Sequence, residues 1–404
     1  MMSRKKPRIA VVSPFLDKQH GTERCVVEWL SGVEDRFEIH LYSQAVEDLD
    51  LSRIKWHRIP TIPGPHLLNY VWWFTANHLW RAWDRAVHGL RYDLTYSPGV
   101  NCLNADVISV HIMFAELLRK NAESLRLRAH PIFDWPRLFH RKVYYHIIAS
   151  LERHLYRRAD VTLLVIAQRV SDGLQEFYGR KDASPVVYFG LDHAIFNPAR
   201  RLELREAARE QLRVKPGEFA LLLIGNDWLN KGLPTLLDAM SQLRDSPLRL
   251  LVVGQDDRAP YVKSIEEKSL RKQVDFFPPR KDVEFYYAAA DVYVGPSKED
   301  ALPLPPAEAM ACGLPVIVTA KCGVSEIITD GQDGLIMRDP VNAADLADKL
   351  RTLYKDSGSR QRLGEKAAET ARRFTWDRSA QEFGEILAQA LRKKATADVP
   401  DRDT

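Results

Sequence analysis

Short apolar runs alternate with segments of helical periodicity along most of the chain. Apolar runs bounded by turn residues predict buried strands, and apolar positions at i, i+3, i+4 and i+7 predict the helices between them. Residues 233–243 show this repeat through Leu233, Leu236, Leu237 and Met240. The clearest predicted strands are 8–12, 161–166, 219–224, 248–253, 291–294 and 316–319. This alternation is typical of parallel sheets covered by helices, so the predicted class is α/β with two doubly wound units.

The length of the chain supports two units as well. At about 150 residues per domain, 404 residues are too many for one compact domain. Phe196-Asn197-Pro198 leads into a charged stretch, 200–213, before the second series of strands begins. We therefore predict an N-terminal domain over 1–195 and a C-terminal domain over 196–375.

Composition narrows the class of protein further. The chain is 45% hydrophobic and 28% charged, which is ordinary for a globular protein. Its 58 basic and 54 acidic residues leave a net charge of +4, which gives no argument for nucleic acid as a partner. No apolar run reaches the roughly 18 residues that span a bilayer, and the run at 9–12 is too short for a signal peptide. We therefore expect a cytoplasmic protein.

One segment, 119–158, departs from this charge balance. It carries many more basic than acidic residues, with the aromatic residues Phe133, Trp135, Phe139, Tyr144 and Tyr145 interleaved. Together with the cluster Trp72-Trp73-Phe74, it fits a face that lies on an anionic membrane surface. A solvated helix pair whose aromatic residues belong to the core explains the same pattern.

The stretch 296–317 is the most informative for chemistry. It reads as a loop, a short helix and a strand, with Asp300 in the loop and Glu308 near the start of the helix. Ligands of open α/β sheets bind at this carboxyl edge, and two carboxylates there can accept hydrogen bonds from the hydroxyls of a sugar and a ribose. The alternative is that Glu308 caps its helix and Asp300 is a turn residue.

Other polar residues follow predicted strands in the same way. Lys231 lies in the loop 225–232, where its charge could act on a diphosphate leaving group, although a solvated lysine is the default interpretation. Gly21 opens the helix that follows the first strand, as in a phosphate- or acceptor-binding loop. His111 follows residues 106–110 at the end of another strand, where a single histidine is more often structural than catalytic.

Taken in this order, the motifs resemble the family-4 (GT4) retaining glycosyltransferases of the GT-B fold. The segments that carry the resemblance are 7–14, 21–24, 110–111, 190–198, 225–232, 296–317 and 325–331. The resemblance implies two Rossmann-like domains that face each other across a cleft, the second of which holds most of the donor. It also implies that a last helix, about 376–392, packs back onto the first domain.

The resemblance also implies an activity, which is the transfer of a hexose from a UDP- or GDP-sugar to an acceptor hydroxyl with retention and without a metal. Carried over by position, Glu308 binds the ribose hydroxyls, Asp300 binds the hydroxyls of the donor sugar, and Lys231 neutralises the diphosphate. His111 lies beside the transferred sugar, and Glu326 lies near the nucleotide. Gly21 lets the first loop approach the donor closely. The acceptor would be a glycan. If the 119–158 segment contacts a membrane, the acceptor would be a lipid-linked glycan, like those of polysaccharide biosynthesis at the cell surface.

Three departures from the family pattern affect these roles. Asp300 stands where the family usually has Glu, and Asn226 stands where a basic residue often follows the glycine. Pro303, Pro305 and Pro306 lack N–H groups, so only residues such as Leu304 and Ala307 can donate to phosphate there.

These departures motivate a second hypothesis, a catalytically weak nucleotide-sugar-binding subunit that supports a partner transferase. A nicotinamide-dependent dehydrogenase is a poor third hypothesis, because no GxGxxG follows any predicted strand.

Overall fold

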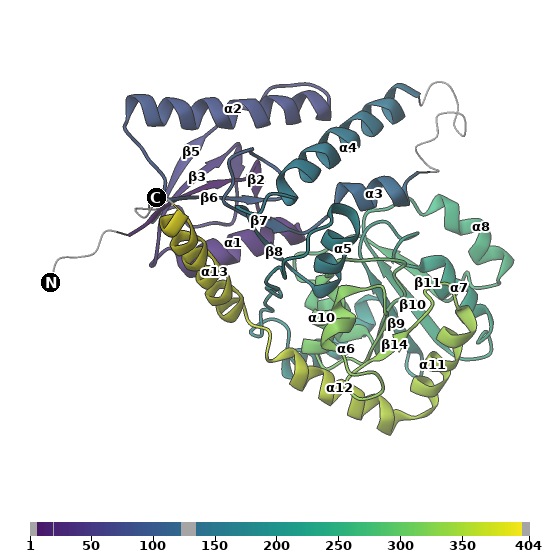
Figure 1. Ribbon diagram of the computed structural model, residues 1–404. Helices are drawn as coiled ribbons and strands as arrows, with labels where there is room; N and C mark the ends of the chain where they lie inside the picture. Colours follow the sequence, from purple (N-terminus) through teal and green to yellow (C-terminus); the bar gives the residue numbers. More distant parts are fainter. Residues whose placement is uncertain (1–5, 19, 123–134, 398–404) are drawn as a thin grey trace. The chain divides into compact units, whose positions relative to one another are not determined.

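The computed structural model describes residues 6–18, 20–122 and 135–397, which fall into two compact units (Figure 1). Unit 1 comprises Met1–Tyr188 together with Trp376–Thr404, and unit 2 comprises Phe189–Thr375. Each unit is built on a 6-stranded sheet.

Unit 1 is built around a sheet with the strand order β5-β3-β1-β6-β7-β8. Its neighbouring strands all pair in parallel. The chain starts beside the middle, runs to one edge and then returns to build the other half, which is the doubly wound pattern. The strands are β1 (Arg8–Val12), β3 (Glu38–Ser43), β5 (Ile54–Arg58), β6 (Leu94–Pro98), β7 (Val107–Val110) and β8 (Thr162–Val165). A separate pair of short strands, β2 (Phe15–Leu16) and β4 (Ala45–Val46), lies near the end of β1.

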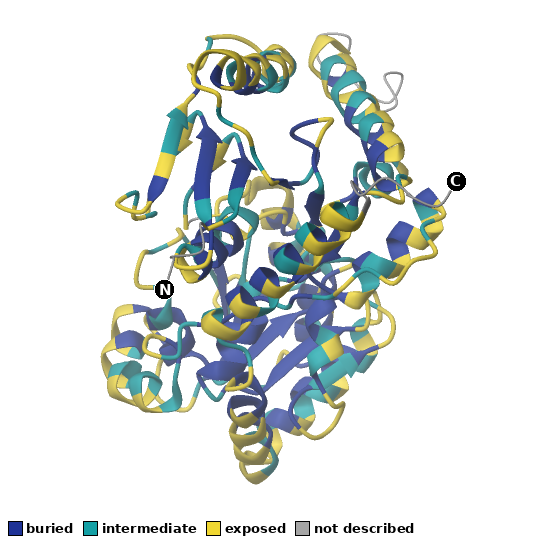
Figure 2. Ribbon diagram, turned by 60° about the vertical axis from the view of Figure 1, so that its left-hand side comes forward, coloured by how far each residue is buried: buried dark blue, intermediate teal, exposed yellow. Residues whose placement is uncertain are grey.

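Helices that are apolar on one side cover this sheet. They are α1 (Gly21–Val33), α2 (His66–Val87), α3 (Phe114–Lys120), α4 (Trp135–Tyr156), α5 (Gln168–Tyr178) and the last helix, α13 (Trp376–Ala397). The indole N–H of Trp29 on α1 donates to the Ser379 hydroxyl on α13 over 2.8 Å. The Trp29 ring stacks on Phe383 with ring centroids 4.9 Å apart. The last helix is therefore part of the core of unit 1 (Figure 2).

Unit 2 repeats the same plan, with the strand order β11-β10-β9-β12-β13-β14 and parallel pairing throughout. Its strands are β9 (Phe219–Ile224), β10 (Leu248–Val253), β11 (Val274–Phe277), β12 (Val292–Gly295), β13 (Val316–Thr319) and β14 (Leu335–Met337). Its α-helices are α6 (Pro198–Gln211), α7 (Leu233–Ser241), α8 (Ala259–Glu267), α9 (Glu284–Ala289), α10 (Leu304–Ala311), α11 (Ala343–Lys355) and α12 (Ser357–Ala371). The central strands are buried on both faces, as expected for apolar runs in a parallel sheet.

The fold class predicted from the sequence is confirmed, and four predicted strands have the predicted bounds. The predicted strands 161–166 and 291–294 correspond to β8 and β12 with slightly different ends. Unit 1 ends at Tyr188, whereas we predicted the boundary at residue 195. The difference arises because the intervening residues bond to unit 2: the Leu191 N–H donates to the Phe374 carbonyl, and His193 Nε2 lies 3.0 Å from the same oxygen.

Candidate active site

The carboxyl edge of the unit 2 sheet is formed by three loops that are hydrogen-bonded to one another. They follow β9, β12 and β13 and comprise residues 225–232, 296–303 and 320–322. The side-chain amide of Asn230 donates to the Glu299 carbonyl over 2.8 Å, and the Lys298 N–H donates to the Asn230 carbonyl over 2.7 Å. The Thr319 hydroxyl donates to the Ser297 carbonyl over 2.7 Å. These bonds fix the three loops relative to one another.

Lys231 and Asp300 form an ion pair at the centre of this edge. Their side chains are 17% and 19% exposed, so water screens the pair less than it would screen a surface pair. The backbone of Asp300 is fixed too, because its N–H donates to the Lys321 carbonyl and its carbonyl accepts from the Gly323 N–H. The cation and the carboxylate are therefore held side by side before any ligand arrives.

Two glycines let the Lys231 loop adopt this path. Gly232 has a φ of +81°, and a Cβ there would lie 2.1 Å from the Pro296 carbonyl oxygen. Gly225 has a φ of +139°, and a Cβ there would lie 2.8 Å from Cε of Lys231. A side chain at Gly232 would push the lysine loop away from the loop after β12, and one at Gly225 would displace the end of the Lys231 side chain.

Glu308 lies deeper, in the second turn of α10 rather than at its start, because the helix already begins at Leu304. Its side chain is buried and accepts a hydrogen bond of 2.7 Å from the Tyr287 hydroxyl on α9. Burial raises the pKa of Tyr287 well above its ordinary value, so the phenol stays protonated and keeps donating. Leu304 is the first residue of α10, a helix that has no side-chain cap.

The remaining unit 2 candidates are more exposed. The Asn226 side-chain oxygen accepts from the Gln255 N–H over 2.7 Å, which ties the β9 loop to the loop after β10. Glu326 is exposed on a short 3₁₀ helix, Gly323–Ile327, that begins next to the Asp300 backbone.

Gly21 and His111 belong to unit 1. His111 follows β7, is 6% exposed, and has Nε2 3.0 Å from the Ser109 hydroxyl. Burial lowers the pKa of His111 to about 4, so the imidazole is neutral near pH 7. Gly21 is the exposed first residue of α1, with open space where a Cβ would stand.

The unit 2 candidates thus lie along the carboxyl edge of the unit 2 sheet; they are Asn226, Lys231, Asp300, Leu304, Glu308 and Glu326. In unit 1, Gly21 and His111 lie at the carboxyl edge of that unit's own sheet. Sequence reasoning missed Asn230 and Tyr287, which hold the loops and Glu308 in place. Asn230 directly precedes Lys231 and could have been noticed, but Tyr287 has no local signal. Within residues 6–18, 20–122 and 135–397, no cluster of three or more His, Cys, Asp or Glu side chains could hold a metal ion.

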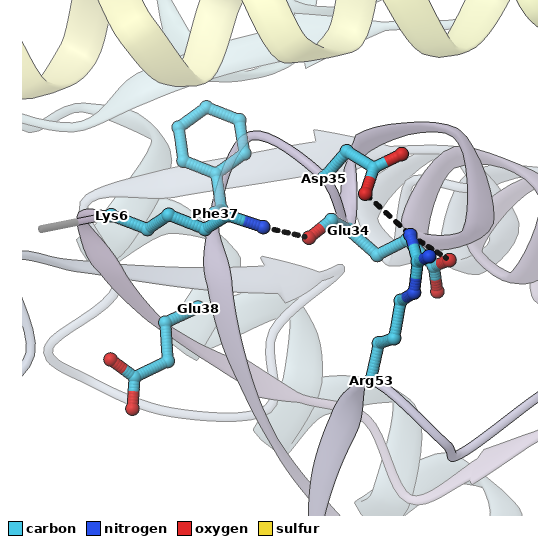
Figure 3. A pocket seen from close by; sticks show the side chains of 6 residues that line it. All are labelled: Lys6, Glu34, Asp35, Phe37, Glu38 and Arg53. Carbon is cyan, nitrogen blue, oxygen red and sulfur yellow. Dashed lines mark hydrogen bonds and ion pairs between the residues drawn. The ribbon is translucent and has the colours of Figure 1, made fainter. Parts of the chain in front are cut away.

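A cavity of about 440 Å³ lies at the other end of the unit 1 sheet, near the starts of β1, β3 and β5 (Figure 3). Its basic side chains are engaged within the cavity: Arg53 pairs with Asp35, and the Lys6 ammonium donates to the backbone carbonyl of Glu34 over 3.3 Å. Ligands of parallel sheets bind at the carboxyl ends of the strands, so this cavity does not belong to the candidate site.

Comparisons with known proteins bear on this arrangement. Residues 205–370, which lie within unit 2, match the model of the family described as glycosyl transferases group 1. A D-inositol 3-phosphate glycosyltransferase of Xylanimonas cellulosilytica is 30% identical over 247 residues, which is 58% of each chain. The lipopolysaccharide glucosyltransferase WaaG of Escherichia coli K12 is 34% identical over 167 residues, or 40% of this chain and 44% of WaaG. The chain therefore spans about half the length of the curated relatives it matches.

Solved structures extend the likeness in fold to nearly the whole chain. A crystal structure of WaaG, a glycosyltransferase involved in lipopolysaccharide biosynthesis, covers 94% of this chain with a TM-score of 0.72 and 21% identity. Anabaena Alr3699/HepE, solved in complex with UDP and glucose, covers 95% with a TM-score of 0.68 and 20% identity. Residues 205–370 are thus similar to the group 1 glycosyltransferases, in agreement with the resemblance that the motifs carry, and the architecture of the chain is that of the GT-B fold.

Proposed function

We propose that this protein transfers a hexose from a nucleotide-diphosphate sugar to an acceptor hydroxyl, with retention at the anomeric carbon and without a metal. The observation that carries the proposal is the preformed Lys231–Asp300 pair at the carboxyl edge of a group 1 glycosyltransferase domain. A fixed cation beside a fixed carboxylate suits a ligand that combines a diphosphate with sugar hydroxyls. The HepE structures with UDP and with UDP-glucose support the same class of donor.

In this proposal the unit 2 candidate residues bind different parts of the donor. Glu308, oriented by Tyr287, accepts hydrogen bonds from the ribose hydroxyls, and Asp300 accepts them from the hydroxyls of the transferred sugar. Asn226, Glu326 and the Leu304 N–H complete the nucleotide contacts. Lys231 neutralises the charge that develops on the diphosphate as the glycosidic bond breaks, which is the step where a fixed cation accelerates the reaction most.

Retention follows from a same-face reaction in this proposal. The acceptor oxygen attacks the anomeric carbon from the side that the diphosphate leaves, and the acceptor proton passes to a departing phosphate oxygen. We assign His111 the position beside the sugar, where it acts as a hydrogen-bonding group. Its pKa, lowered by burial to about 4, keeps the imidazole uncharged. A double displacement would require a carboxylate directly under the sugar ring, and we assign that role to no residue.

Titration calorimetry with UDP, GDP, ADP, TDP and NAD tests the proposal. We expect one nucleoside diphosphate to bind the intact chain far more tightly than NAD, and the corresponding nucleotide sugar to be turned over when EDTA is present. Diphosphate binding without turnover of any donor would favour the subunit that supports a partner transferase, for which Asn226 and Asp300 are the sequence arguments. An absence of binding by every diphosphate would overturn both.

We also propose that the acceptor is lipid-linked and that the protein works peripherally on the cytoplasmic face of the plasma membrane, against anionic lipid. Of the sequence cluster, Trp73 is buried and donates to Asn101, so it belongs to the core. The outward side of α2 is nevertheless apolar over most of its length. Its exposed large residues are Leu68, Val71, Leu79, Trp83 and Val87.

The neighbouring helix, α4, adds exposed basic residues, which suit an anionic lipid surface. Part of the 119–158 segment, including Phe133, lies outside the described residues, but α4 is described and carries exposed cations. They are Arg137, Arg141, Lys142 and Arg153, while its one acidic residue, Glu152, is buried. An apolar helix face flanked by basic residues is typical of interfacial binding. None of the described helices is both long and apolar enough to cross a bilayer.

Co-sedimentation with vesicles measures this binding. We expect binding to phosphatidylglycerol-containing vesicles, with little binding to phosphatidylcholine alone. The double variant Leu79→Glu, Trp83→Glu should bind at least tenfold more weakly. Leu202→Glu, at a residue of unit 2 that is 66% exposed, is the matched control and should bind normally. Equal binding of the double variant and the control would rule out the α2 surface.

A further inference from the structure

The short segment that carries His111 lies between a strand and a helix. It follows Val110, which pairs with Val165 in the parallel sheet of unit 1. It leads through Ile112 and Met113 into α3, which begins at the next residue. Because so few residues separate His111 from α3, a displacement of the start of α3 would move the imidazole as well.

A buried carboxylate on α4, that of Glu152, holds the start of α3. It accepts a hydrogen bond from the Phe114 N–H, whose nitrogen lies 3.0 Å from Oε1 and 2.9 Å from Oε2. The Ala115 nitrogen lies 3.4 Å from Oε2, and the Tyr178 hydroxyl on α5 donates to the same oxygen. The chain has no local substitute, because Met113, which precedes α3, makes no side-chain cap. One carboxylate therefore joins α3, α4 and α5.

Met113 fixes the same segment by packing. Its side chain is buried and lies over Gly173 on α5, where a Cβ would stand 2.2 Å from Cε of Met113. The segment between His111 and α3 is therefore held by a steric contact with α5 as well as by the hydrogen bonds to Glu152.

Phe114 also belongs to an aromatic wall in unit 1. The wall lines a cavity of about 210 Å³ at the carboxyl ends of β1 and β6. The Tyr144 ring meets Phe114 edge to face, with centroids 5.7 Å apart, and meets Tyr70 in the same way at 5.4 Å. Glu23 on α1 lines the same cavity. The carboxylate that holds Phe114 therefore holds this wall together with the His111 segment.

The surroundings of Glu152 make its charge variable near neutral pH. The residue is 1% exposed, and burial raises its pKa to about 7, although the hydrogen bonds that it accepts oppose the rise. The other titratable groups that face it are phenols: Tyr178 on α5, Tyr156 on α4 and Tyr70 on α2. Burial raises the pKa of all three, so these phenols stay protonated.

The charged residues of the helices around Glu152 are engaged elsewhere. Glu116 on α3 lies 3.5 Å from Arg169 on α5, and Arg119 pairs with Glu176. Arg153, the next residue of α4, is exposed. The hydrogen bonds from α3 and α5 are therefore what favours the ionised form of Glu152.

The two charge states of Glu152 hold the start of α3 with different strength. An ionised carboxylate only accepts hydrogen bonds, so it suits the two N–H groups and the hydroxyl that face it. Hydrogen bonds to a charged acceptor are also stronger than those to a neutral one. A protonated carboxyl group accepts more weakly, and one of its oxygens must itself donate. Protonation therefore loosens the start of α3.

We propose that Glu152 is a positioning residue for the transfer reaction, which holds the His111 segment in its reactive place when ionised and loosens it when protonated. The inference rests on the proposed transferase function, since it concerns the histidine that we place beside the transferred sugar. It makes turnover depend on a buried acid of α4 that does not touch the substrate.

NMR of the His111 imidazole in the full chain tests the inference without any substrate, with His111→Gln to identify the signal. The pKa of His111 is about 4, so a shift of its signal between about pH 6 and about pH 8 reports a neighbouring group. We expect a midpoint at about pH 7 in the parent chain and no such shift in Glu152→Gln. Tyr178→Phe should move the midpoint to higher pH, because the hydrogen bond that it removes favours the ionised form.

Steady-state kinetics with the donor identified by calorimetry gives the second readout. The kcat of the parent chain should rise as pH increases through about 7, and Glu152→Gln should lose this dependence. Because small misplacements of a reacting group are costly, we expect this variant to lose about tenfold in kcat, with an unchanged KM for the donor. Glu116→Gln is the matched control on α3 and should keep the midpoint and the kcat of the parent chain.

The other outcomes overturn the inference. They are a His111 signal that does not change around pH 7 in the parent chain, a change of equal size in Glu152→Gln, and a kcat of the parent chain that is independent of pH. If Glu152→Gln does not fold, the parent chain and Tyr178→Phe decide the question, because an unchanged midpoint in Tyr178→Phe contradicts the assignment.

Calorimetry with nucleoside diphosphates separates this inference from the proposed function. Normal diphosphate binding without a His111 shift rejects the role of Glu152 alone. A His111 shift that depends on Glu152, in a chain that binds none of the diphosphates, rejects the proposed donor function and leaves the link between these two residues standing.

Discussion

The two sheets share one strand order, yet their carboxyl edges differ in how charge is arranged. In unit 2 the edge carries a cation and a carboxylate that already bind each other, Lys231 and Asp300, and a buried carboxylate with its own donor, Glu308 with Tyr287. In unit 1 the edge carries a neutral histidine, His111, a wall of aromatic rings, and an acid, Glu23, that forms no ion pair with another residue in the described part of the chain.

The difference shows two ways of preparing a site for polar ligands. A pair of opposite charges costs less to keep out of water than either charge alone, and it stands ready for a strongly charged ligand such as a diphosphate. An acid among rings can accept hydrogen bonds from the hydroxyls of a neutral ligand or pair with a ligand cation. The same doubly wound framework can thus serve two different substrates.

The largest expected effect comes from removing the cation of unit 2. Lys231→Ala removes the ammonium that pairs with Asp300 and takes away the charge that stabilises the leaving diphosphate. Removing one such electrostatic group typically lowers kcat by about 100- to 1,000-fold, and we expect a loss of that size in turnover of the donor. Steady-state kinetics with the nucleotide sugar identified by calorimetry measures it.

Lys298→Ala is the matched control, because this exposed lysine lies on the loop after β12 and should lose less than threefold. A double-mutant cycle with Asp300→Asn then asks whether the pair acts as a unit, in which case the two losses are not additive. Near-normal turnover by Lys231→Ala would show that the pair is only structural.

A smaller effect, on donor affinity, is expected from removing the hydroxyl that donates to the buried Glu308. Tyr287→Phe removes the hydroxyl that orients Glu308 but leaves the carboxylate itself, so donor affinity should fall by roughly tenfold, or about 1.4 kcal/mol. Glu308→Ala should weaken donor binding further. Calorimetry measures both, and Tyr286→Phe is the control, since its hydroxyl donates to the Pro278 carbonyl instead. Equal affinity in Tyr287→Phe and Tyr286→Phe would mean that Glu308 needs no orienting donor.

Most of the fold could be predicted from the sequence because parallel strands are buried on both faces and appear as continuous apolar runs. This holds for β9, β10 and β13, which have the predicted bounds. The signal fails for β3 and β5, because β3 contains Glu38 and His40 and β5 contains Lys55, His57 and Arg58. Polar contacts between neighbouring strands, such as the 2.9 Å approach of His40 Nδ1 to His57 Nε2, replace apolar packing there.

The unit 2 candidates could be found because they follow strands within short motifs. Their partners could not, because Tyr287 reaches Glu308 from another helix and Lys231 meets Asp300 only through folding. The cavity lined by Glu23, Tyr70 and Tyr144 could not be predicted as a whole, because only Glu23 lies in a motif and the two tyrosines are far from it in the sequence. Charged motifs are visible in the chain, whereas an aromatic cavity is visible only in the structure.

The smallest effect concerns the pH dependence of stability in unit 1. Burial lowers the pKa of His111 from 6.5 to about 4, so as pH falls through this window the unfolded chain takes up a proton that the folded chain does not. The free energy of unfolding therefore decreases as pH falls, and from about pH 7 to about pH 5 this histidine alone contributes a loss of about 2 kcal/mol. His40 and His57, whose pKa values burial also lowers, act in the same direction. Glu152, whose pKa burial raises to about 7, acts in the opposite direction, because in the fold it gains a proton as pH falls.

The contribution of His111 must therefore be measured as the difference in the free energy of unfolding between the parent chain and a variant that lacks this histidine. Urea unfolding of the parent chain and of His111→Gln, at about pH 7 and about pH 5, cancels the groups that both chains share. We expect the parent chain to lose about 2 kcal/mol more than the variant over this interval. His146→Gln, at an exposed histidine of α4, should behave like the parent chain. Identical pH dependence in all three chains would mean that water or an unrecognised partner reaches His111 in solution, and the surroundings of His111 would then differ less from the charged edge of unit 2 than the structure indicates.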